Sequence, residues 1–364
     1  MQDILQCKDL AKLSSVLDVQ LRVTSLSGAR VWLCKYDNSS FILKVIQRKN
    51  GKPSKYTDEV TAELEMLKYI KKHIIDTGAS PCFIELLYDA TCEPARLSTD
   101  DSAVAGKSIN YQKLYSDFVA YQQRHQDGKM GRRVSLIALE YAQISLNQYL
   151  NWVVDDALGE MNVRVFLFMI IHALRVLEIG LPETRHRDLH PDNIMIKFVA
   201  DWSVPVDGSY NVFTIGDESW IVPFYGAFPK IIDFGGIISP ELGMRSEMEE
   251  LPLSTQHIRN DMQWLLGFVY NVASINGLSR IVGLVNALDP RMHHTNILPR
   301  GAESEEFPSL NDMLHSEVFA PFTNNDVLQK TGINIYQRYE INTGTGSAAG
   351  ANAAHHSRRA SARK

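Results

Sequence analysis

The chain is short of the features that mark secreted, metal-binding or membrane proteins. Its four cysteines, at positions 7, 34, 82 and 92, show neither the spacing of zinc ligands nor that of a disulfide framework. The longest apolar run, 165–177, is too short to cross a bilayer and includes His172 and Arg175. The first residues, with Asp3 and Lys8, do not resemble a secretory signal. These absences predict a protein without a membrane span in an intracellular, reducing compartment.

Apolar residues, by contrast, are abundant enough for a large core. Hydrophobic residues make up 45% of the 364 residues and charged residues 22%, which is typical of globular proteins. The net charge is −5, yet residues 341–364 include Arg and Lys side chains and no acidic one. The Gly, Ala and Ser content predicts a disordered tail from about residue 341. Its basic end is either a solubilising terminus or a contact for nucleic acid, anionic lipid or a localisation receptor.

Two motifs that carry carboxylates give the strongest signal. Residues 185–193 read Arg-His-Arg-Asp-Leu-His-Pro-Asp-Asn, and residues 231–235 read Ile-Ile-Asp-Phe-Gly. Phosphoryl transfer needs a group that positions the acceptor hydroxyl and hard oxygen ligands for Mg²⁺. Asp188 and Asn193 fit a loop that offers a carboxylate to the hydroxyl and an amide oxygen to a metal, and Asp233 offers a further oxygen. Asp-Phe-Gly alone would indicate only a strand-to-turn junction, but both motifs in this order indicate a phosphoryl-transfer site.

The two motifs resemble those of the eukaryotic-type protein kinase superfamily. The resemblance implies that Asp188 is the catalytic base, that Asn193 and Asp233 bind Mg²⁺, and that Phe234 sets the active or inactive pose. It also implies ATP as the phosphoryl donor. The implied fold is α+β and bilobal, with a small antiparallel β-rich N-lobe that contains a helix and a larger, mostly helical C-lobe.

Upstream of both motifs, a lysine interrupts an apolar segment. Residues 41–46 read Phe-Ile-Leu-Lys-Val-Ile, and burying the ammonium of Lys44 is costly unless it meets an anion. In the kinase family this position anchors the phosphates of ATP. Apolar residues at helical spacing over 59–70 predict a helix, on which Glu63 takes the place of the glutamate that pairs with the lysine. Glu59, one turn earlier, is the alternative, and either glutamate alone would indicate a solvent-facing helix.

The chain lacks the glycines of a phosphate-binding loop. Counted back from Val31, the three usual glycine positions hold Thr24, Leu26 and Ala29, and Gly28 is the one glycine of this stretch. Glycines let backbone N–H groups approach phosphates closely, so their absence predicts a looser or reshaped cover over ATP. Gly28 and Val31 are the nucleotide contacts that the resemblance implies here.

An apolar strand and the residues after it resemble the hinge between the lobes of a kinase. Residues 134–139 read Val-Ser-Leu-Ile-Ala-Leu, and Glu-Tyr-Ala follows. The resemblance places Leu139 at the gatekeeper position and gives backbone groups from Glu140 to Ala142 to the adenine edge. Met195, in the strand after the catalytic loop, would close the adenine pocket from below, although methionine there is also an ordinary core residue.

The family pattern divides the chain into segments. It predicts a leader at 1–20, an N-lobe at 21–139 with an insertion at about 91–133, a C-lobe at 140–325 with an extra hairpin at about 199–228, and an extension at 326–364. Apolar periodicity adds predicted strands and helices. The strands are 29–36, 41–46, 83–90, 134–139 and 194–198, and the helices are about 57–73, 110–123, 145–154, 162–179 and 309–322.

The segment before Asp233 is longer than the tight turn usual in kinases. Two apolar runs, 210–215 and 220–226, flank a Gly-Asp-Glu-Ser turn and predict the extra hairpin. Residues 222–235 are similar to kinases encoded by nucleocytoplasmic large DNA viruses, such as iridoviruses, ascoviruses and giant amoebal viruses. That similarity implies a virus-encoded kinase that acts in the cytoplasm or nucleus of the host cell, or in the virion.

The segment from Asp233 to Thr255 corresponds to a kinase activation segment, although no Ala-Pro-Glu closes it. Arg187 suits control by a phosphorylated residue, and the alternative is a loop that folds without phosphorylation. The candidates for phosphorylation are Ser239, Ser246, Ser254 and Thr255, and Ser361 in Arg-Arg-Ala-Ser is a candidate for autophosphorylation. Asp261 takes the position of the aspartate that fixes the catalytic-loop backbone.

Three functions stay open. The complete set of polar residues favours a kinase for Ser and Thr hydroxyls of proteins, because the residues after Asp188 lack the pattern of tyrosine kinases. A small-molecule kinase of the aminoglycoside or choline type is the second, since such enzymes also carry Asp-Leu-His-Pro and His190 stands where Ser/Thr kinases have Lys. Arg187 and the intact Asp-Phe-Gly argue against it. The third is a nucleotide-binding pseudokinase scaffold, which the degraded glycine loop indicates.

Overall fold

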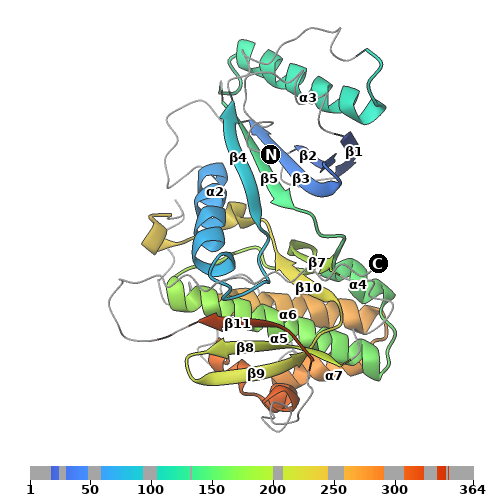
Figure 1. Cartoon of the computed structure of the whole chain (residues 1–364), viewed down its shortest axis with the longest axis vertical. Helices are drawn as coiled ribbons and strands as arrows, with labels where there is room; N and C mark the ends of the chain where they lie inside the picture. The colour runs from blue at the N-terminus through green and yellow to red at the C-terminus, as the bar shows by residue number, and fades with distance from the viewer. Residues whose placement is uncertain are drawn as a thin grey trace.

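The computed structural model gives a mixed α+β protein. It describes residues 18–23, 30–47, 59–92, 105–131, 133–199, 208–244, 258–290, 307–323, 334–341 and 343. Their strands form three sheets, in which all pairs are antiparallel except one. Figure 1 shows the largest sheet in the upper part of the molecule and most of the helices in the lower part. The α+β class predicted from the sequence is confirmed.

The largest sheet has five strands in the order β1-β2-β3-β5-β4. They are β1 (Asp18–Val23), β2 (Arg30–Tyr36), β3 (Ser39–Gln47), β4 (Leu86–Cys92) and β5 (Val134–Glu140). The turn between β2 and β3 holds Asp37 and Asn38 at φ 45° and 61°, the left-handed pair that a two-residue hairpin needs. The register places Lys44 opposite Val31 on one side and opposite Ile137 on the other.

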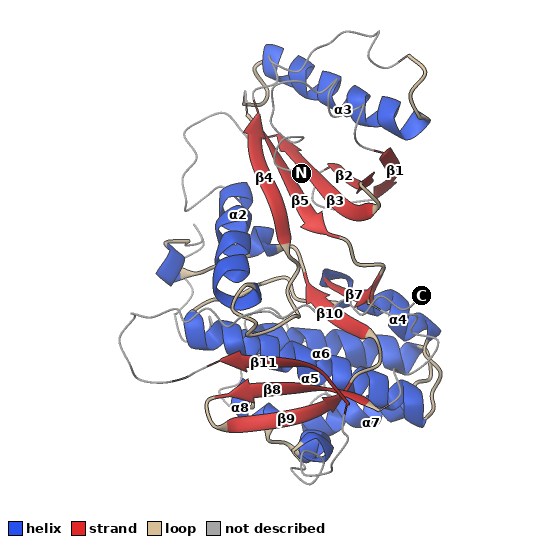
Figure 2. Ribbon diagram, viewed as in Figure 1, coloured by secondary structure: helices blue, strands red, loops and turns tan. Residues whose placement is uncertain are grey.

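Two helices flank this sheet. Helix α2, Glu59–Ile70, lies beside β4 and continues into a π-helical turn over Lys71–Ile75 (Figure 2). Helix α3, Ile109–Gln126, lies within the predicted insertion and packs against β1. Its Leu114 joins Trp32 of β2 in an apolar cluster separate from the main core. The described part of the insertion therefore covers the outer end of the sheet.

The lower part is centred on α5, Ala157–Gly180. Asp156 caps its first turn by accepting a hydrogen bond from the N–H of Gly159 at 2.7 Å. Apart from its two arginines, every residue from 163 to 177 is buried, which confirms the predicted buried helix. The other helical elements of this part are α4 (Leu146–Trp152), α6 (Ile258–Ile275), α7 (Ser279–Leu288), α8 (Leu310–Leu314) and a 3-10 helix over Glu317–Phe322.

A three-stranded sheet in the order β10-β7-β6 brings the two sequence motifs together. Its strands are β6 (Ile144–Ser145), β7 (Ile194–Phe198) and β10 (Ala227–Ile231). β7 begins directly after Asn193, and β10 ends two residues before Asp233. Because Ile194 pairs with Ile231 in the antiparallel register, the ends of both motifs lie side by side.

A third sheet contains the predicted hairpin and one strand that was not predicted. The hairpin consists of β8 (Ser209–Ile215) and β9 (Glu218–Pro223). Strand β11, Asn334–Ile341, pairs in parallel with β8 and belongs to the extension to which the sequence assigned no element. Tyr339 is its one buried residue, so no apolar alternation marked it. The basic tail at 344–364 lies outside the described residues.

Other boundaries differ from the sequence predictions. Strand β1 begins at Asp18, inside the segment 1–20 that was predicted as a leader. The strand predicted at 83–90 is shifted to 86–92, and the helix predicted from 162 begins at 157, where Asp156 caps it. Element type was right for the second strand and the helix but not for residues 18–20, where no strand was predicted. The ends depend on caps and partner strands that periodicity does not show.

In the part of the chain that the structure describes, no helix has both the length and the apolar character needed to cross a membrane. Cys34 and Cys82 are buried and unbridged. Burial raises the pKa of both thiols to about 12, so neither is a reactive thiolate at neutral pH.

Candidate active site

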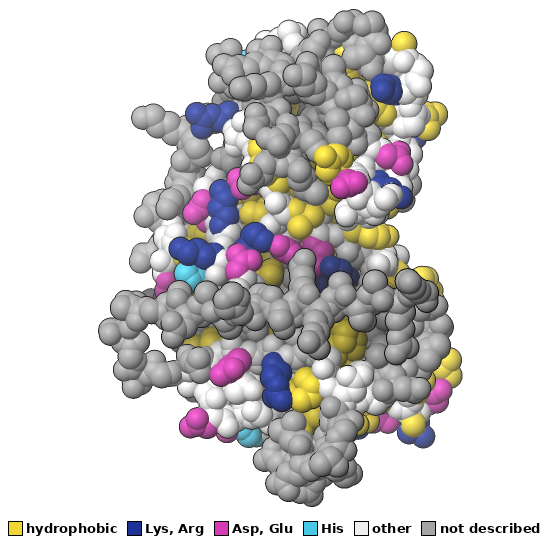
Figure 3. Space-filling model, viewed as in Figure 1, with side chains coloured by type: hydrophobic (Ala, Val, Ile, Leu, Met, Phe, Trp, Pro, Cys, Tyr) yellow, Lys and Arg dark blue, Asp and Glu magenta, His cyan; other side chains and the backbone are white. Residues whose placement is uncertain are grey.

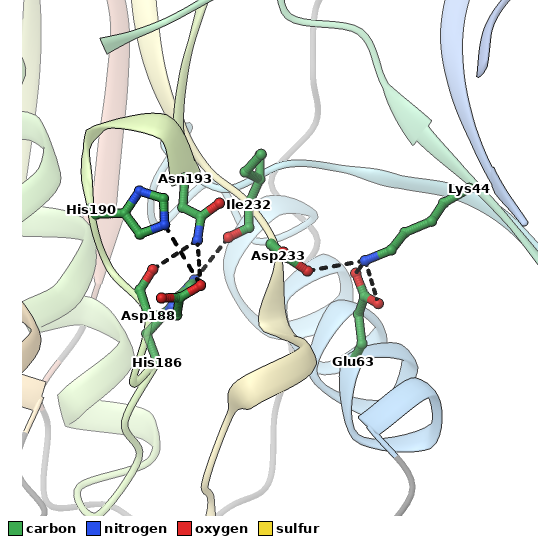
Figure 4. Close-up of polar contacts among 8 residues, drawn as sticks. All are labelled: Lys44, Glu63, His186, Asp188, His190, Asn193, Ile232 and Asp233. Atoms are coloured by element: carbon green, nitrogen blue, oxygen red, sulfur yellow. Dashed lines mark hydrogen bonds and ion pairs between the residues drawn. The ribbon is translucent and has the colours of Figure 1, made fainter. Parts of the chain in front are cut away.

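The ammonium of Lys44 on β3 is held by two carboxylates from other elements. Its Nζ donates to Oε1 and Oε2 of Glu63 on α2, both at 2.8 Å, and to Oδ1 of Asp233 at 3.0 Å (Figure 4). Lys44 is 8% exposed and Glu63 is 3% exposed. The pairing predicted from the sequence is present, and α2 supplies Glu63 rather than Glu59, which is exposed.

Lys44 and Asp233 stabilise each other in their charged forms. Burial alone would lower the pKa of Lys44, but the carboxylates of Glu63 and Asp233 outweigh it and raise the pKa above its usual value. Burial would likewise raise the pKa of Asp233, but the Lys44 ammonium outweighs it and lowers the pKa. At Glu63, burial outweighs the Lys44 ammonium, and the pKa is raised. With both carboxylates ionised, the cluster has one more negative than positive charge, which suits an added cation.

Asp233 lies at a strained point of the backbone. Its φ of 62° and ψ of 71° are left-handed, a conformation that costs a residue other than glycine about 1–3 kcal/mol. The turn Phe234–Gly236 follows, and the ring of Phe234 is buried beside Phe83 and His186, at centroid distances of 6.3 and 5.1 Å. Burying a phenylalanine contributes about 1.5–3 kcal/mol, which offsets the strain. The buried ring thereby fixes the direction of the Asp233 carboxylate.

Asp188 lies in the loop before β7 with its side chain 58% exposed. The Nδ2 of Asn193 donates to the Asp188 backbone oxygen at 2.8 Å and to its Oδ2 at 3.1 Å. The Nε2 of His190 lies 3.6 Å from the same Oδ2 (Figure 4). His190 Nδ1 accepts from the N–H of Asp192 at 3.3 Å, so the tautomer that fits carries its proton on Nε2, facing Asp188.

A buried carboxylate on α6 holds the backbone of this loop. Asp261 accepts hydrogen bonds from the N–H of His186 at 2.6 Å and from the N–H of Arg187 at 2.8 Å. Arg187 has a left-handed φ of 68°, and this bond stabilises it there. The ring Nε2 of His186 also lies 2.8 Å from the backbone oxygen of Ile232, the residue before Asp233. The contact expected for Asp261 from its position in the sequence is therefore present.

The oxygen atoms of Asn193 and Asp233 fit a divalent cation. Since Asn193 donates its Nδ2 to Asp188, its Oδ1 is left on the side of Asp233 (Figure 4). Mg²⁺ prefers such oxygens and often takes one or two side chains together with substrate phosphates. Among the described residues, no group of three or more His, Cys, Asp or Glu could hold a metal. A cation here would take its further ligands from water or from substrate phosphates.

The predicted hinge residues lie where the chain leaves the upper sheet. Leu139 and Glu140 end β5, and Ala142 follows in the link to β6, with all three buried. The Glu140 carboxylate forms ion pairs with Lys197 of β7 and, at 2.9 Å, with Lys230 of β10. Burial alone would raise the pKa of Glu140, but the ammonium groups of Lys230 and Lys197 outweigh it and lower the pKa. Its side chain is thus committed to the lysines, and its N–H donates to the backbone oxygen of Glu85 at 2.9 Å. The nucleotide contact predicted for this backbone stays a prediction.

This ion-pair cluster is the main feature of the region that the sequence interpretation missed. Lys197 and Lys230 each interrupt an otherwise apolar strand, as Lys44 does. The same argument that assigned an anion to Lys44 would have predicted a carboxylate beside these two lysines. Charged side chains of both signs gather on the middle of the face in Figure 3, where the upper and lower parts meet.

Two of the other predicted nucleotide contacts lie within the described residues, and one does not. Val31 on β2 is half-buried and lies opposite Lys44 in the sheet. Met195 on β7 is half-buried and lies opposite Lys230. Gly28 and the rest of the segment 24–29 lie outside the described residues, so the reshaped cover over ATP stays a prediction.

The candidates for phosphorylation fall into two groups. Ser246, Ser254, Thr255 and Ser361 lie outside the described residues. Ser239 is fully buried and accepts a hydrogen bond from Thr184 Oγ1 at 2.7 Å. A hydroxyl in this position is out of reach of a modifying enzyme, so the prediction for Ser239 is wrong.

A cavity of about 530 Å³ opens in the lower part, among α5, α7 and the 3-10 helix at 317–322. Its charged lining residues are Glu160, Arg164, Arg280 and Glu317. Glu160 pairs with both arginines, so the lining has no excess of either charge. None of the residues described above lines this cavity, and geometry gives it no part in the chemistry of the candidate site.

The sequence matches no protein-family model and no curated protein. The functional interpretation therefore depends on the residues and distances of the site itself. Three distant segments contribute the bonded side chains of Lys44, Glu63 and Asp233, and Asp188 and Asn193 of one loop lie beside them.

Proposed function

We propose that this chain is an ATP-dependent protein kinase that transfers the γ-phosphoryl group to Ser and Thr hydroxyls of proteins. The contact that carries the proposal is the simultaneous bonding of Lys44 to Glu63 and Asp233. One carboxylate would be enough to neutralise a buried lysine. The second carboxylate, on a side chain that is 33% exposed, adds a negative charge beside this pair, and a bound cation would balance that charge.

Each residue of the site has a part in the proposed reaction. Lys44 binds phosphate oxygens of ATP, and Glu63 orients its ammonium. Asn193 Oδ1 and the Asp233 carboxylate would hold Mg²⁺, which neutralises phosphate charge when bound. Asp188 accepts the proton of the acceptor hydroxyl. A bond forms between that oxygen and the γ-phosphorus, the bond from the γ-phosphorus to the β,γ-bridging oxygen breaks, and ADP leaves.

The proposal extends to the fold, which we infer to be bilobal and kinase-like. The upper sheet with α2 and α3 would be the N-lobe, predicted at 21–139, and the lower part would be the C-lobe, predicted at 140–325. The backbone of Glu140 and Ala142 would bind the adenine edge. The apolar side chains of Val31, Leu139 and Met195 would flank the base, with the predicted contact of Gly28 beside the phosphates.

One observation favours a small-molecule kinase as a second candidate. The catalytic loop has His190 beside the Asp188 carboxylate, within an Asp-Leu-His-Pro run similar to those of aminoglycoside and choline kinases. A pseudokinase scaffold is less well supported, because the cluster of Lys44, Glu63 and Asp233 is complete. The virus-encoded origin and the anionic partner of the basic tail both stay predictions.

A transfer assay with parallel acceptors tests the proposal. The purified chain is incubated with Mg²⁺ and γ-labelled ATP, and with a basic protein rich in Ser and Thr, choline or an aminoglycoside. We expect label on Ser and Thr of the protein acceptor and none in an Asp188→Asn variant. Label on choline or the aminoglycoside alone would establish the second candidate instead. Binding of ATP with no transfer to any acceptor would indicate a pseudokinase.

A further inference from the structure

The C-terminal strand β11 contacts the segment that follows the helix carrying Glu63. The N–H of Glu340 donates to the backbone oxygen of Gly78 at 3.2 Å. The side chain of Tyr339 is 4% exposed, and burial together with the nearby Cys82 raises its pKa. β11 therefore meets the segment 76–83 through the backbone bond from Glu340 to Gly78, and the buried Tyr339 lies near Cys82 of that segment. Figure 1 shows it passing below α2.

That segment ends a continuous helical element. Helix α2 runs into the π-helical turn at 71–75 without a gap, and Gly78 ends the element at φ 74°. The N–H of Gly78 bonds to the oxygen of Ile75, and the N–H of Ala79 bonds to that of Ile74. Glu63 and Gly78 are on the order of 20 Å apart along this element. Because a helix is stiff, a shift of its last turn moves Glu63 as well.

Strand β10 holds the same segment from another direction. The N–H of Ile231 donates to the oxygen of Cys82 at 2.8 Å, and the N–H of Ile84 donates to the oxygen of Ile231 at 3.0 Å. Ile231 lies two residues before Asp233. The helix that carries Glu63 and the strand that leads to Asp233 are thus joined at this point. β11 supplies the further contacts that hold the joined segments on the lower part.

β11 is itself well anchored. It pairs with β8 along its length, and Tyr336 and Tyr339 stack on Phe224 and Phe213 at centroid distances of 4.0 and 5.1 Å. The N–H groups of a strand alternate in direction, and that of Glu340 faces away from β8. The N–H of Arg338, two residues earlier, faces the same way and has no acceptor among the described residues.

We propose that β11 is a positioning element for the Lys44–Glu63 pair. By holding the last turn of the α2 element on the lower part, it keeps the Glu63 carboxylate at Lys44. None of the five polar residues of the site lies on β11, so this role of residues 334–341 goes beyond the proposed function. The effect on turnover rests on the proposed kinase function, whereas the effect on the position of α2 does not.

A pair of proline variants tests the backbone contact. Glu340→Pro removes the donor to Gly78 and spares the pairing with β8, because proline is tolerated where the N–H faces outward on an edge strand. Arg338→Pro is the matched control. Hydrogen exchange is measured for peptides covering 60–84. We expect exchange about fivefold faster in Glu340→Pro, the effect of one net hydrogen bond, and wild-type rates in Arg338→Pro.

A second pair tests the side-chain contact and still decides the question if Glu340→Pro fails to fold. Tyr339→Ala removes the ring that lies near Cys82, and Tyr336→Ala removes a ring that stacks on Phe224 instead. Faster exchange at 60–84 in Tyr339→Ala alone supports the proposal. The proposal is overturned if exchange at 60–84 is the same in Glu340→Pro as in Arg338→Pro, and the same in Tyr339→Ala as in Tyr336→Ala.

Turnover measurements separate this proposal from the kinase proposal. In Glu340→Pro we expect kcat to fall by a similar factor of about five, with KM for the protein acceptor unchanged, because Asp188 is untouched. Faster exchange in a chain whose wild type transfers no phosphate would uphold the positioning by β11 and overturn the kinase. Normal exchange with reduced kcat would overturn the positioning.

Discussion

The two ends of the candidate site are built in opposite ways. At one end, Lys44 and Glu63 are nearly inaccessible to solvent, and the ammonium has its carboxylate partners within 3.0 Å. At the other end, the Asp188 side chain is 58% exposed, and the Nε2 of His190 lies 3.6 Å from its carboxylate. Protein groups close the first end, whereas the second is open to solvent.

In the proposed reaction, the closed end would hold a phosphate and the open end would react. A buried ion pair adds little net stability, yet it is costly to break. Under the proposed function, the closed end would therefore serve to fix the geometry of a bound phosphate. The open end would leave room for an acceptor, and a change of its exposed carboxylate should cost little stability. Substitutions at the closed end should thus affect both stability and transfer, and those at the open end should affect transfer alone.

Asp188→Asn tests the open end and has the largest expected effect. We expect transfer to fall by about 10²–10⁴-fold, because an amide cannot take the proton of the acceptor hydroxyl. Unfolding free energy and nucleotide binding should stay nearly unchanged, since the side chain is mostly exposed. Label transfer from γ-labelled ATP and denaturant unfolding measure the two quantities.

The matched control for this variant is Asp192→Asn in the same loop. Its carboxylate bonds to Ser145 and Asn147 at the start of α4 rather than to Asn193. We expect a much smaller loss of transfer. Activity near wild type in Asp188→Asn would eliminate Asp188 as the base, and an equal loss in both variants would mean that the loop, not the carboxylate, matters.

Lys44→Met tests the closed end. The change leaves Glu63 buried without its partner, so we expect the free energy of unfolding to fall by about 3–5 kcal/mol, together with a severe loss of transfer. Denaturant unfolding and the transfer assay measure these effects. The double variant Lys44→Met with Glu63→Leu replaces the pair by apolar side chains and should regain stability without regaining transfer. Recovery of both would show that the pair serves folding alone.

The sequence predicted both ends of the site because their chemistry restricts residue types at fixed spacing. The loop around Asp188 and the turn at Asp233 each follow or precede an apolar strand, and a lysine in an apolar run needs an anion, which Glu63 supplies. Contacts that no motif or unpaired charge marks, such as the pairing of β11 with β8, could not be predicted. Strand β11 has one buried residue, because its pairing with β8 rather than its own apolar face holds it.

Asp261→Asn tests whether the hydrogen bonds from Asp261 hold the backbone of the loop that carries Asp188. An amide can accept only one of the N–H groups of His186 and Arg187, so we expect a stability loss of about 1–3 kcal/mol. Transfer should fall as well, because the loop that carries Asp188 loses its anchor. Asp155→Asn is the control: its carboxylate accepts from Ser279 and Arg280 far from the site. It should lower stability and leave kcat unchanged.

Glu140→Gln tests whether every buried, ion-paired carboxylate near the site is needed for transfer. Glu140 is buried and paired with lysine, as Glu63 is. Lys230 and Lys197 overcome the effect of burial and hold the pKa of Glu140 below its usual 4.5. The carboxylate therefore adds stability above that value, which is lost as the pH falls through the lowered pKa.

Glutamine does not titrate and leaves the buried Lys230 without a carboxylate, although it can still accept a hydrogen bond. The variant should therefore be about 1–3 kcal/mol less stable at neutral pH and lose less stability on acidification. Unfolding by denaturant across this pH range measures the difference in slope. Transfer at neutral pH should stay near wild type, because the side chain faces Lys197 and Lys230 rather than Lys44. A loss of transfer as large as that of Lys44→Met would mean that the ion pairs behind the hinge belong to the reacting end, and the contrast between the two ends would no longer hold.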